Sequence, residues 1–522
     1  MNRIMKIINQ KFILIICFFV LFGGVLLISE KYSQSFHFVD EDDHLVFASF
    51  INKDYKLYTD LSTNHQPLVY FLSSLTQKAV KPTTLFTLIK SGREAVFLYS
   101  FIASLFLFFY FGPIFLLFSL FFELTKFFIF GNLLLSESLV VYPLVFILGE
   151  SFRTVFFKKP PKSWQGFIFG LCNFLIFFNL LPLIPGILAF DIIFLLKTKK
   201  LKSFLVGLIL PTILLFLFVN PLDYFRETIV YNVKYVVPVL APVKGIRDMV
   251  IIFLFPFLSF INGRQSIMNQ FIQFFTIILL INFILLIYKK KIKKILWWVL
   301  FFLLILSFNN RNLVPGEMFY TGFHLLPWYA AFIFFNLLTL KINFSEIKSK
   351  IKYILIFLLI LGGGILFSSR YMPYLVAIDK NYEHNINFYP YYVIGKAINA
   401  VADSKDSLAV LPDESLIYWL AGTKLATRQV IYHSWEYQAP LLKEQMDKVF
   451  TVDPPDFIYI NYERVKNAGY VNLINEVLAK EYWQANIQGI AQKLYLKKSK
   501  IKAINENQWQ EWTKLSFDKI NL

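Results

Sequence analysis

AVFLYSFIASLFLFFYF at residues 95–111 and PIFLLFSLFFELTKFFIFG at residues 113–131 are two long apolar runs separated by a single glycine. Each is close to the roughly 20 residues that an α-helix needs to cross the hydrocarbon of a bilayer. Because backbone N–H and C=O groups cannot stay unpaired in lipid, both runs are predicted to be helical. We therefore expect the protein to be built in a membrane.

The rest of the chain has the same character. Of its 522 residues, 57% are apolar, 16% are charged and 61 are Phe. A water-soluble chain cannot bury that proportion of apolar surface, which excludes a soluble enzyme, a fibrous protein and a disordered tail. Both cysteines, Cys17 and Cys172, lie in apolar runs, so a disulfide framework is excluded as well.

Nine further apolar runs bring the predicted number of membrane spans to eleven. They lie near residues 12–29, 133–152, 164–181, 182–196, 203–219, 269–288, 295–309, 319–340 and 353–368. The run at 249–261 has 13 residues and contains Pro256. It is too short to cross and predicts an interfacial or re-entrant helix.

The chain carries 52 Lys and Arg against 34 Asp and Glu, a net charge of +18. Lys-rich clusters follow the apolar runs near residues 158–162, 197–202, 289–294 and 341–352, and Arg3, Lys6 and Lys11 precede the first run. Basic residues collect in cytoplasmic loops, so the charge indicates topology rather than nucleic-acid binding. We expect a multi-pass plasma-membrane protein with a cytoplasmic N-terminus, an uncleaved first span and an extracytoplasmic C-terminus.

The expected fold class is a polytopic α-helical membrane protein with a C-terminal extracytoplasmic α/β domain. Residues 1–368 form the predicted transmembrane domain, with a first extracytoplasmic loop at 30–94, and residues 369–522 form the second domain. Within the second domain, strands are predicted at Leu408–Leu411 and Phe457–Ile460, and helices near 412–421 and 470–481.

The first extracytoplasmic loop contains a run of four acidic residues, Asp40, Glu41, Asp42 and Asp43, followed by His44. Adjacent carboxylates raise one another's pKa unless a cation, a hydrogen-bond donor or water compensates. Such a run suits a general base or a divalent cation site. The alternative is a solvated acidic turn that caps a helix starting near Leu45, where negative charge is favourable.

Downstream of this run, the segment predicts an amphipathic helix, a polar turn at 53–59 and a second amphipathic helix that begins at His65-Gln66-Pro67. Proline costs nothing at a helix start, because the N–H it lacks has no partner there. Both helices are expected to lie on the membrane surface through their apolar faces.

This pattern resembles the first extracytoplasmic loop of GT-C glycosyltransferases. The shared features are an Asp-Glu pair after the first span, a short helix, a Tyr-x-Asp turn that contains Tyr58, and a His-x-Pro motif that begins at His65. More narrowly, it is similar to the protein O-mannosyltransferase and aminoarabinose transferase branch. The resemblance covers about the first 370 residues as hydrophobic layout, and its specific part is residues 40–70.

The resemblance implies roles for particular residues. Asp40 matches the catalytic aspartate and Glu41 its neighbour, while His65 and Tyr58 are assigned to substrate binding. Asp42 and Asp43 have no fixed counterpart, which leaves open which carboxylate is the base. They also make a Mg²⁺ or Mn²⁺ site conceivable without requiring one.

Further substrate-binding candidates lie in later segments. Arg311 and His324 resemble the family's Arg and His that meet the lipid phosphate, and Glu137 is similar to an acidic residue near the second outer loop. The alternatives are snorkelling for Arg311, a helix-packing hydrogen bond for His324 and an ordinary interfacial carboxylate for Glu137. Glu123 and Lys126, three residues apart, are expected to pair.

The resemblance implies an inverting hexosyl or pentosyl transfer from a polyprenyl-phosphate sugar to the hydroxyl of a protein, lipid or glycan acceptor. Asp40 would take the acceptor proton, and polyprenyl phosphate would leave already ionised. A multi-span transporter or lipid-linked glycan flippase is the alternative, and a receptor with a working tail is a third interpretation. No nucleic-acid module, Gly-rich phosphate loop or Cys/His metal motif occurs in the sequence.

Overall fold

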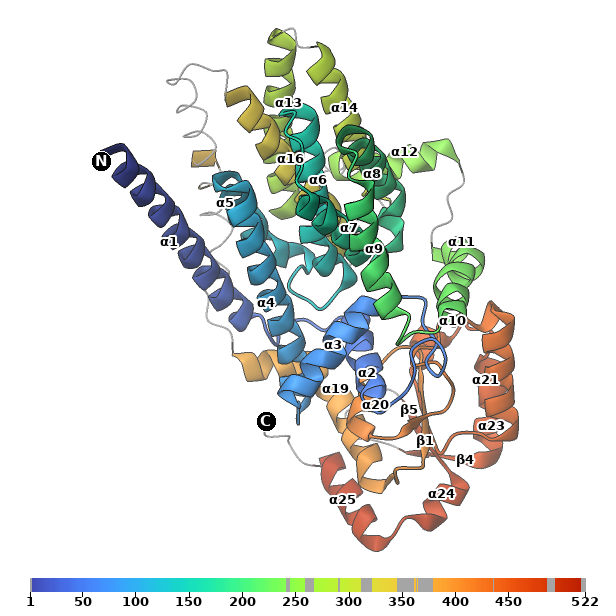
Figure 1. The fold of residues 1–522 in the computed structure, drawn as a ribbon. Coiled ribbons are helices and arrows are strands. Elements are labelled where there is room, and N and C mark those ends of the chain that lie inside the picture. The colour runs from blue at the N-terminus through green and yellow to red at the C-terminus, as the bar shows by residue number, and fades with distance from the viewer. Residues whose placement is uncertain are drawn as a thin grey trace. The chain divides into compact units, whose positions relative to one another are not determined.

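The protein is mostly helical, with a small sheet in its C-terminal region (Figure 1). The computed structural model describes residues 2–240, 245–258, 267–289, 292–310, 322–344, 361–362, 364, 379–434, 436–485 and 493–517.

Within these residues, six helical segments are long and apolar enough to cross a membrane. They are Lys11–Lys31 of α1 (Asn2–Lys31), α4 (Leu85–Phe111), α6 (Ser136–Phe156), Leu181–Thr198, which ends with α8 (Ile184–Thr198), Met268–Tyr288 of α13 (Ile267–Tyr288), and Gly322–Asn343, which includes α16 (Leu326–Phe344). The sequence prediction of a helical membrane protein is confirmed at this level.

The predicted number of eleven spans is not confirmed. Four of the predicted spans form helices of 13 to 15 residues, shorter than the roughly 20 that a crossing needs. They are α5 (Pro113–Thr125), α7 (Ser163–Phe177), α9 (Leu201–Leu215) and α14 (Ile292–Leu306). The run at 353–368 falls almost entirely outside the described residues. The short helix predicted around Pro256 is present as α12 (Ile246–Leu258).

Glycines allow α7 and α9 to pack backbone against backbone. A Cβ atom on Gly170 of α7 would lie 2.0 Å from the carbonyl oxygen of Phe204, and one on Gly207 of α9 would lie 2.0 Å from that of Phe167. Such close approach through small residues is a common packing mode between helices in membranes. Gly170 and Gly207 therefore allow the close approach of the two helices, which a larger residue at either position would prevent.

The chain divides into two compact units, which are discontinuous in sequence. Unit 1 comprises Met1–Lys31, Arg93–Leu215 and Val243–Ile378, and unit 2 comprises Tyr32–Gly92, Phe216–Pro242 and Asp379–Leu522. This division differs from the predicted boundary at residue 368. The first loop belongs to the same unit as the C-terminal region, and helices of the two segments pack against each other.

Unit 2 contains helices from all three of its segments. They are α2 (Val39–Ile51), α3 (Pro67–Val80), α10 (Pro221–Phe225), the π-helix η3 (Arg226–Val236), α11 (Val237–Leu240), α19 (Lys380–Val401), α20 (Leu416–Ala421), α21 (Pro440–Val452), α22 (Tyr462–Val465), α23 (Val471–Glu481), α24 (Lys498–Ala503) and α25 (Glu506–Phe517).

The sheet of unit 2 has five strands in the order β2-β1-β3-β5-β4. They are β1 (Ser407–Leu411), β2 (Lys424–Leu425), β3 (Phe457–Ile460), β4 (Tyr482–Ala485) and β5 (Lys493–Lys497). Strands β2, β1 and β3 are parallel, whereas β5 runs antiparallel to β3 and β4. The predicted strands at 408–411 and 457–460 and the helix near 470–481 are confirmed.

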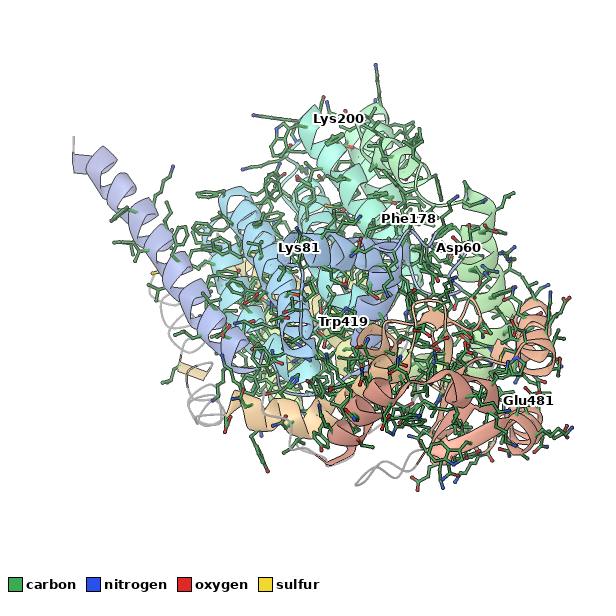
Figure 2. All side chains as sticks on the ribbon, turned by 90° about the horizontal axis from the view of Figure 1, so that it is seen from below. Asp60, Lys81, Phe178, Lys200, Trp419 and Glu481 are labelled. Carbon is green, nitrogen blue, oxygen red and sulfur yellow. The ribbon has the colours of Figure 1, made fainter. Side chains whose placement is uncertain are left out.

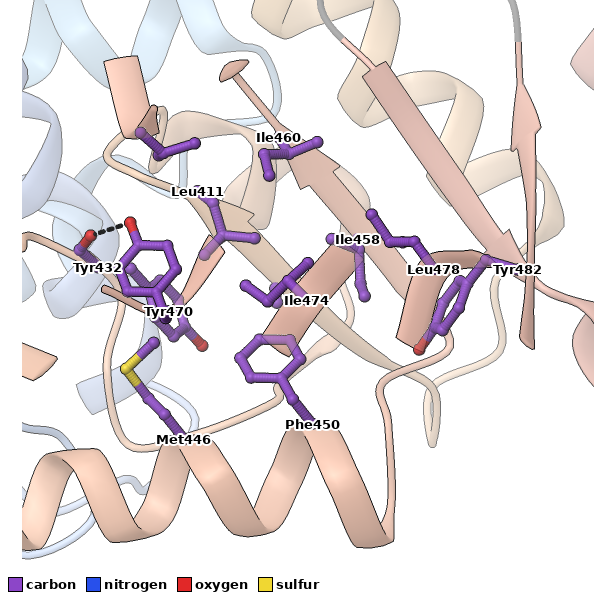
Figure 3. Packing of buried hydrophobic residues seen from close by; sticks show 12 residues of the cluster. Leu411, Tyr432, Met446, Phe450, Ile458, Ile460, Tyr470, Ile474, Leu478 and Tyr482 are labelled. Atoms are coloured by element: carbon purple, nitrogen blue, oxygen red, sulfur yellow. Dashed lines mark hydrogen bonds between the residues drawn. The ribbon is translucent and has the colours of Figure 1, made fainter. Parts of the chain in front are cut away.

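One face of this sheet forms a hydrophobic core with α21 and α23 (Figure 3). Alternate residues of the central strands point into it, such as Leu411 of β1 and Ile458 of β3, while Phe450 and Ile474 come from the helices. The Tyr470 hydroxyl donates a 2.6 Å hydrogen bond to the carbonyl of Tyr432 across the core. This packing holds the ends of β1 and β3 in fixed positions.

Two details of the first loop differ from expectation. Helix α2 begins at Val39 rather than near Leu45, so the acidic run lies within its first turns. All of residues 41–50 are buried, so the prediction that α2 is amphipathic is wrong. Helix α3 does begin at Pro67 and exposes Leu75 and Val80; it ends before Lys81, which is labelled in Figure 2.

Candidate functional site

The acidic run occupies the start of α2. Asp40, Glu41 and Asp42 lie in the first turn, where the partial positive charge of the helix N-terminus stabilises carboxylates. Asp40 is half-buried, whereas Glu41, Asp42 and Asp43 are each about 1% exposed. The alternative of a solvated acidic turn is therefore wrong.

A histidine that precedes the helix compensates part of this buried charge. The Nε2 atom of His37 is in hydrogen-bond contact with the Oδ2 atom of Asp42. On the other side of the ring, Nδ1 lies 3.4 Å from the hydroxyl of Tyr391 on α19. The His37 ring also meets the ring of Phe388 edge-on at 5.5 Å. The C-terminal region therefore encloses the histidine that holds Asp42.

Burial by itself shifts the pKa values of His37 and Asp43 in opposite directions. Burial by itself lowers the pKa of the His37 imidazole, but the neighbouring Asp42 carboxylate outweighs it, and the net pKa is raised. Burial, followed by the charges of Asp40 and Asp42, raises the pKa of the Asp43 carboxyl well above its usual range. The run thus combines an ion pair at Asp42 with a carboxyl at Asp43 that favours its protonated form.

Two more carboxylates come from the turn that follows β1. Asp413 forms a bidentate pair with Arg464 of α22, with N–O distances of 2.5 Å, and Glu414 lies 3.7 Å from the same guanidinium. Asn461, at the end of β3, donates a 2.9 Å hydrogen bond to Glu414. Burial raises the pKa of Asp413 to about 7, although Arg464 opposes the shift.

These groups and the acidic run form one cluster. Asp43 interacts electrostatically with Asp413, and Asp413 interacts with Asp40 and His37. We use the name acidic cluster for Asp40, Asp42, Asp43, Asp413 and Glu414. It lies at the carboxyl ends of the parallel neighbours β1 and β3. In the strand order, β1 leads on to β2 on one side of this pair, and β3 leads on to β4 on the other side. In open α/β sheets, ligands bind at such a switch point.

The predicted residues His65 and Tyr58 lie in the same unit with different environments. The ring of His65 is half-buried and lies 5.7 Å from that of His44, which in turn meets Tyr70 edge-on at 5.3 Å. Tyr58 is fully buried, and its hydroxyl donates a 2.7 Å hydrogen bond to the backbone carbonyl of His65. Tyr58 therefore stabilises the loop, and its role in substrate binding stays a prediction.

The predicted residues of unit 1 are less completely described. Glu137 is buried in the first turn of α6, and the half-buried His324 lies in η4 (Gly322–Leu325), with its ring 4.1 Å from that of Phe323. Arg311 falls outside the described residues. The expected pair of Glu123 and Lys126 is present, with a distance of 2.7 Å.

The described residues give no support to a metal site at Asp42 and Asp43. Among them, no group of three or more His, Cys, Asp or Glu side chains is arranged to hold a metal ion. One oxygen of Asp42 is taken by His37. The role of Asp42 and Asp43 as metal ligands stays a prediction.

The sequence interpretation found no catalytic constellation in the C-terminal region, yet Asp413 and Glu414 belong to the acidic cluster, Arg464 contacts them and Tyr391 lies beside His37. A usable signal was present for two of them. Asp413 and Glu414 directly follow a predicted strand, and polar residues at the carboxyl end of a parallel strand are typical of α/β binding sites. The proximity to residues 37–43 depends on tertiary packing and has no sequence signal.

Comparisons with protein-family models, with curated proteins and with solved structures give no match to this chain. The acidic cluster and its surroundings are therefore the basis for any functional proposal.

Proposed function

We propose that the protein is an integral-membrane glycosyltransferase that moves a sugar from a polyprenyl-phosphate donor to an acceptor hydroxyl, with Asp40 as the general base. In this proposal the four shorter apolar helices and the run at 353–368 also cross the membrane, which gives the eleven-span GT-C-like layout with unit 2 outside. The candidate contacts of the donor phosphate are Arg311, His324 and Glu137, which belong to unit 1.

The observation that carries the proposal is the position of Asp40. It is half-buried, whereas the other carboxylates of its run are enclosed, one of them paired with His37. A general base has to reach its substrate and remain ionised before the reaction. Asp40 is the carboxylate of the run that meets the first requirement, and the α2 N-terminus favours the second.

The reaction is an inverting displacement at the anomeric carbon. Asp40 accepts the proton of the acceptor hydroxyl while that oxygen forms a bond to the anomeric carbon. The bond between this carbon and the phosphate oxygen breaks, and its electron pair leaves with polyprenyl phosphate. Phosphate leaves as an anion, so the leaving group needs little protonation.

A buried ion pair in unit 1 favours the second candidate, a transporter or flippase for lipid-linked glycans. Lys126 and Glu123 are almost fully buried, Lys126 donates to Ser100 at 3.0 Å, and the Tyr142 hydroxyl donates to Glu123 at 2.6 Å. Ionisable groups in an apolar body often mark a transport path. The substitution Lys126→Met, assayed for lipid-linked sugar translocation in proteoliposomes, examines this role.

The decisive experiment uses the full chain in detergent with radiolabelled polyprenyl-phosphate mannose, glucose and aminoarabinose as donors and a cell-envelope extract as acceptor. We expect transfer from one donor and a loss of at least about 100-fold in Asp40→Asn, the usual contribution of a general base. Asp453→Asn is the matched control, because Asp453 is 96% exposed in the same unit. Transfer that persists in Asp40→Asn would contradict the assignment of Asp40 as the general base. The absence of transfer from any of the three donors would contradict the proposed glycosyltransferase function.

A further inference from the structure

The charged groups of the acidic cluster and its neighbours indicate which class of molecule binds there. Its members are five carboxyl groups, and the described residues include two cations in contact with them, His37 and Arg464. An excess of carboxylates repels a phosphate group. The phosphate of a lipid-linked donor is therefore expected to lie elsewhere, and the cluster faces the other reactant.

Three buried oxygen atoms of the cluster have no hydrogen-bond partner among the described residues: Oδ1 of Asp43, Oδ1 of Asp413 and Oε2 of Glu414. The Asp413 oxygen is held by the ion pair with Arg464 at 2.5 Å, which leaves those of Asp43 and Glu414. Buried acceptors are nearly always satisfied in native proteins, and an unsatisfied one costs about 1–3 kcal/mol. Asp43 interacts with Asp40, Asp42 and Asp413, so its free oxygen lies within the cluster rather than apart from it.

The accessible members of the site combine donors, acceptors and an aromatic ring. Asp40 and Tyr391 are half-buried, and the Arg464 side chain is 41% exposed while Asp413 holds it by two contacts. A hydroxyl group both donates and accepts hydrogen bonds, so it suits a mixture of carboxylate, phenol and guanidinium. A molecule with several hydroxyls on one face fits this set better than a simple anion or a metal ion.

We propose that the acidic cluster, with Tyr391 and Arg464, is the acceptor subsite and that its ligand is a neutral glycan. The proposal rests on the glycosyl transfer proposed above and names its acceptor class. The C-terminal region supplies Arg464 and Tyr391 as ligand contacts, while Asp413 is a positioning residue that fixes the guanidinium. The switch point of the sheet thus contributes to the site that begins at Asp40.

The test is binding of the full chain in detergent to an array of neutral, amino-sugar and uronic-acid oligosaccharides, without donor. We expect neutral oligosaccharides to bind, and Arg464→Gln to weaken binding by about tenfold, as expected for the loss of one charge-assisted hydrogen bond. Arg464→Lys keeps the charge but loses the planar fork, so it should be weakened as well. Lys466→Gln, an exposed cation two residues away, is the matched control.

Several outcomes overturn the proposal. They are binding of no saccharide, binding of amino sugars alone, and neutral-glycan binding that both Arg464 variants leave unchanged while their thermal unfolding matches the wild type.

The same assay separates this inference from the proposed function. Asp40→Asn should lose transfer, whereas Lys466→Gln should retain both glycan binding and transfer. Glycan binding without any transfer refutes the enzyme and keeps the subsite, whereas Asp40-dependent transfer with unaffected Arg464 variants refutes the subsite and keeps the enzyme.

Discussion

The guanidinium of Arg428 lies 3.2 Å from the Oε1 atom of Glu227, although 201 residues separate them in the chain. Arg428 also donates to the backbone carbonyl of Tyr58 in the first loop, and the Ser62 hydroxyl donates to the other oxygen of Glu227 at 2.8 Å. One buried carboxylate thus joins the three chain segments of unit 2. Burial raises the pKa of Glu227, while the hydrogen bond from Ser62 and the charge of Arg428 oppose the shift.

We expect Arg428→Met to destabilise unit 2 by about 3 kcal/mol, because the substitution leaves Glu227 buried without its main cation. The measurement is chemical unfolding followed by the fluorescence of the C-terminal region. Lys443→Met is the control, since Lys443 pairs with Asp447 on the exposed surface of α21, and little change is expected. Equal effects of the two substitutions would show that the Arg428 contact has no special role.

Asp43→Asn should be nearly neutral near pH 4, should become increasingly stabilising relative to the wild type as pH rises above that, and should flatten the dependence of stability on pH. The raised pKa means that the folded state holds a proton that the unfolded state releases above about pH 4, so wild-type stability falls as pH rises from there towards the folded pKa. Asn imitates the protonated carboxyl. Thermal unfolding between pH 4 and 8 measures the difference, and identical slopes in variant and wild type would contradict the assignment.

The pair of His37 and Asp42 should stabilise unit 2 mainly at lower pH. Because the folded pKa of His37 is raised, its contribution is fully present below the unfolded value of 6.5 and is lost as pH rises through the folded value. Asp42→Asn should remove the loss that wild-type stability shows as pH rises above 6.5. His433 is the contrast, because burial lowers its pKa to about 4, so its contribution rises from pH 4 to 6.5.

Gly170→Ala should destabilise unit 1 by roughly 2 kcal/mol or more, since the new methyl group meets backbone atoms that cannot rotate away. Gly23→Ala is the matched control in a helix of the same unit, because nothing lies within 4 Å of its added Cβ. The thermal stability of the purified protein in detergent provides the comparison. A Gly170→Ala protein as stable as Gly23→Ala would mean that α7 and α9 do not approach as described.

The sequence was informative where a signal is local. Apolar length predicted the membrane helices, and short strand-like runs between charged and polar residues predicted β1 and β3. It failed where tertiary packing decides: α2 reads as a surface helix with an acidic cap, yet all of residues 41–50 are buried, and the helix packs against both α3 and α20. The same holds for His37 in the candidate site. The sequence does not mark this histidine as a site residue, because its neighbour Tyr391 comes 354 residues later in the chain.

The discontinuity of unit 2 has a consequence for biosynthesis. Helix α2 leaves the ribosome long before Asp379, and at ~5–20 residues per second the interval is roughly 15 to 60 seconds. During that time its acidic and aromatic side chains have no C-terminal partner to enclose them. The first loop therefore completes its packing only after the C-terminal region has been synthesised. Truncation before residue 379 would leave the loop exposed to proteolysis.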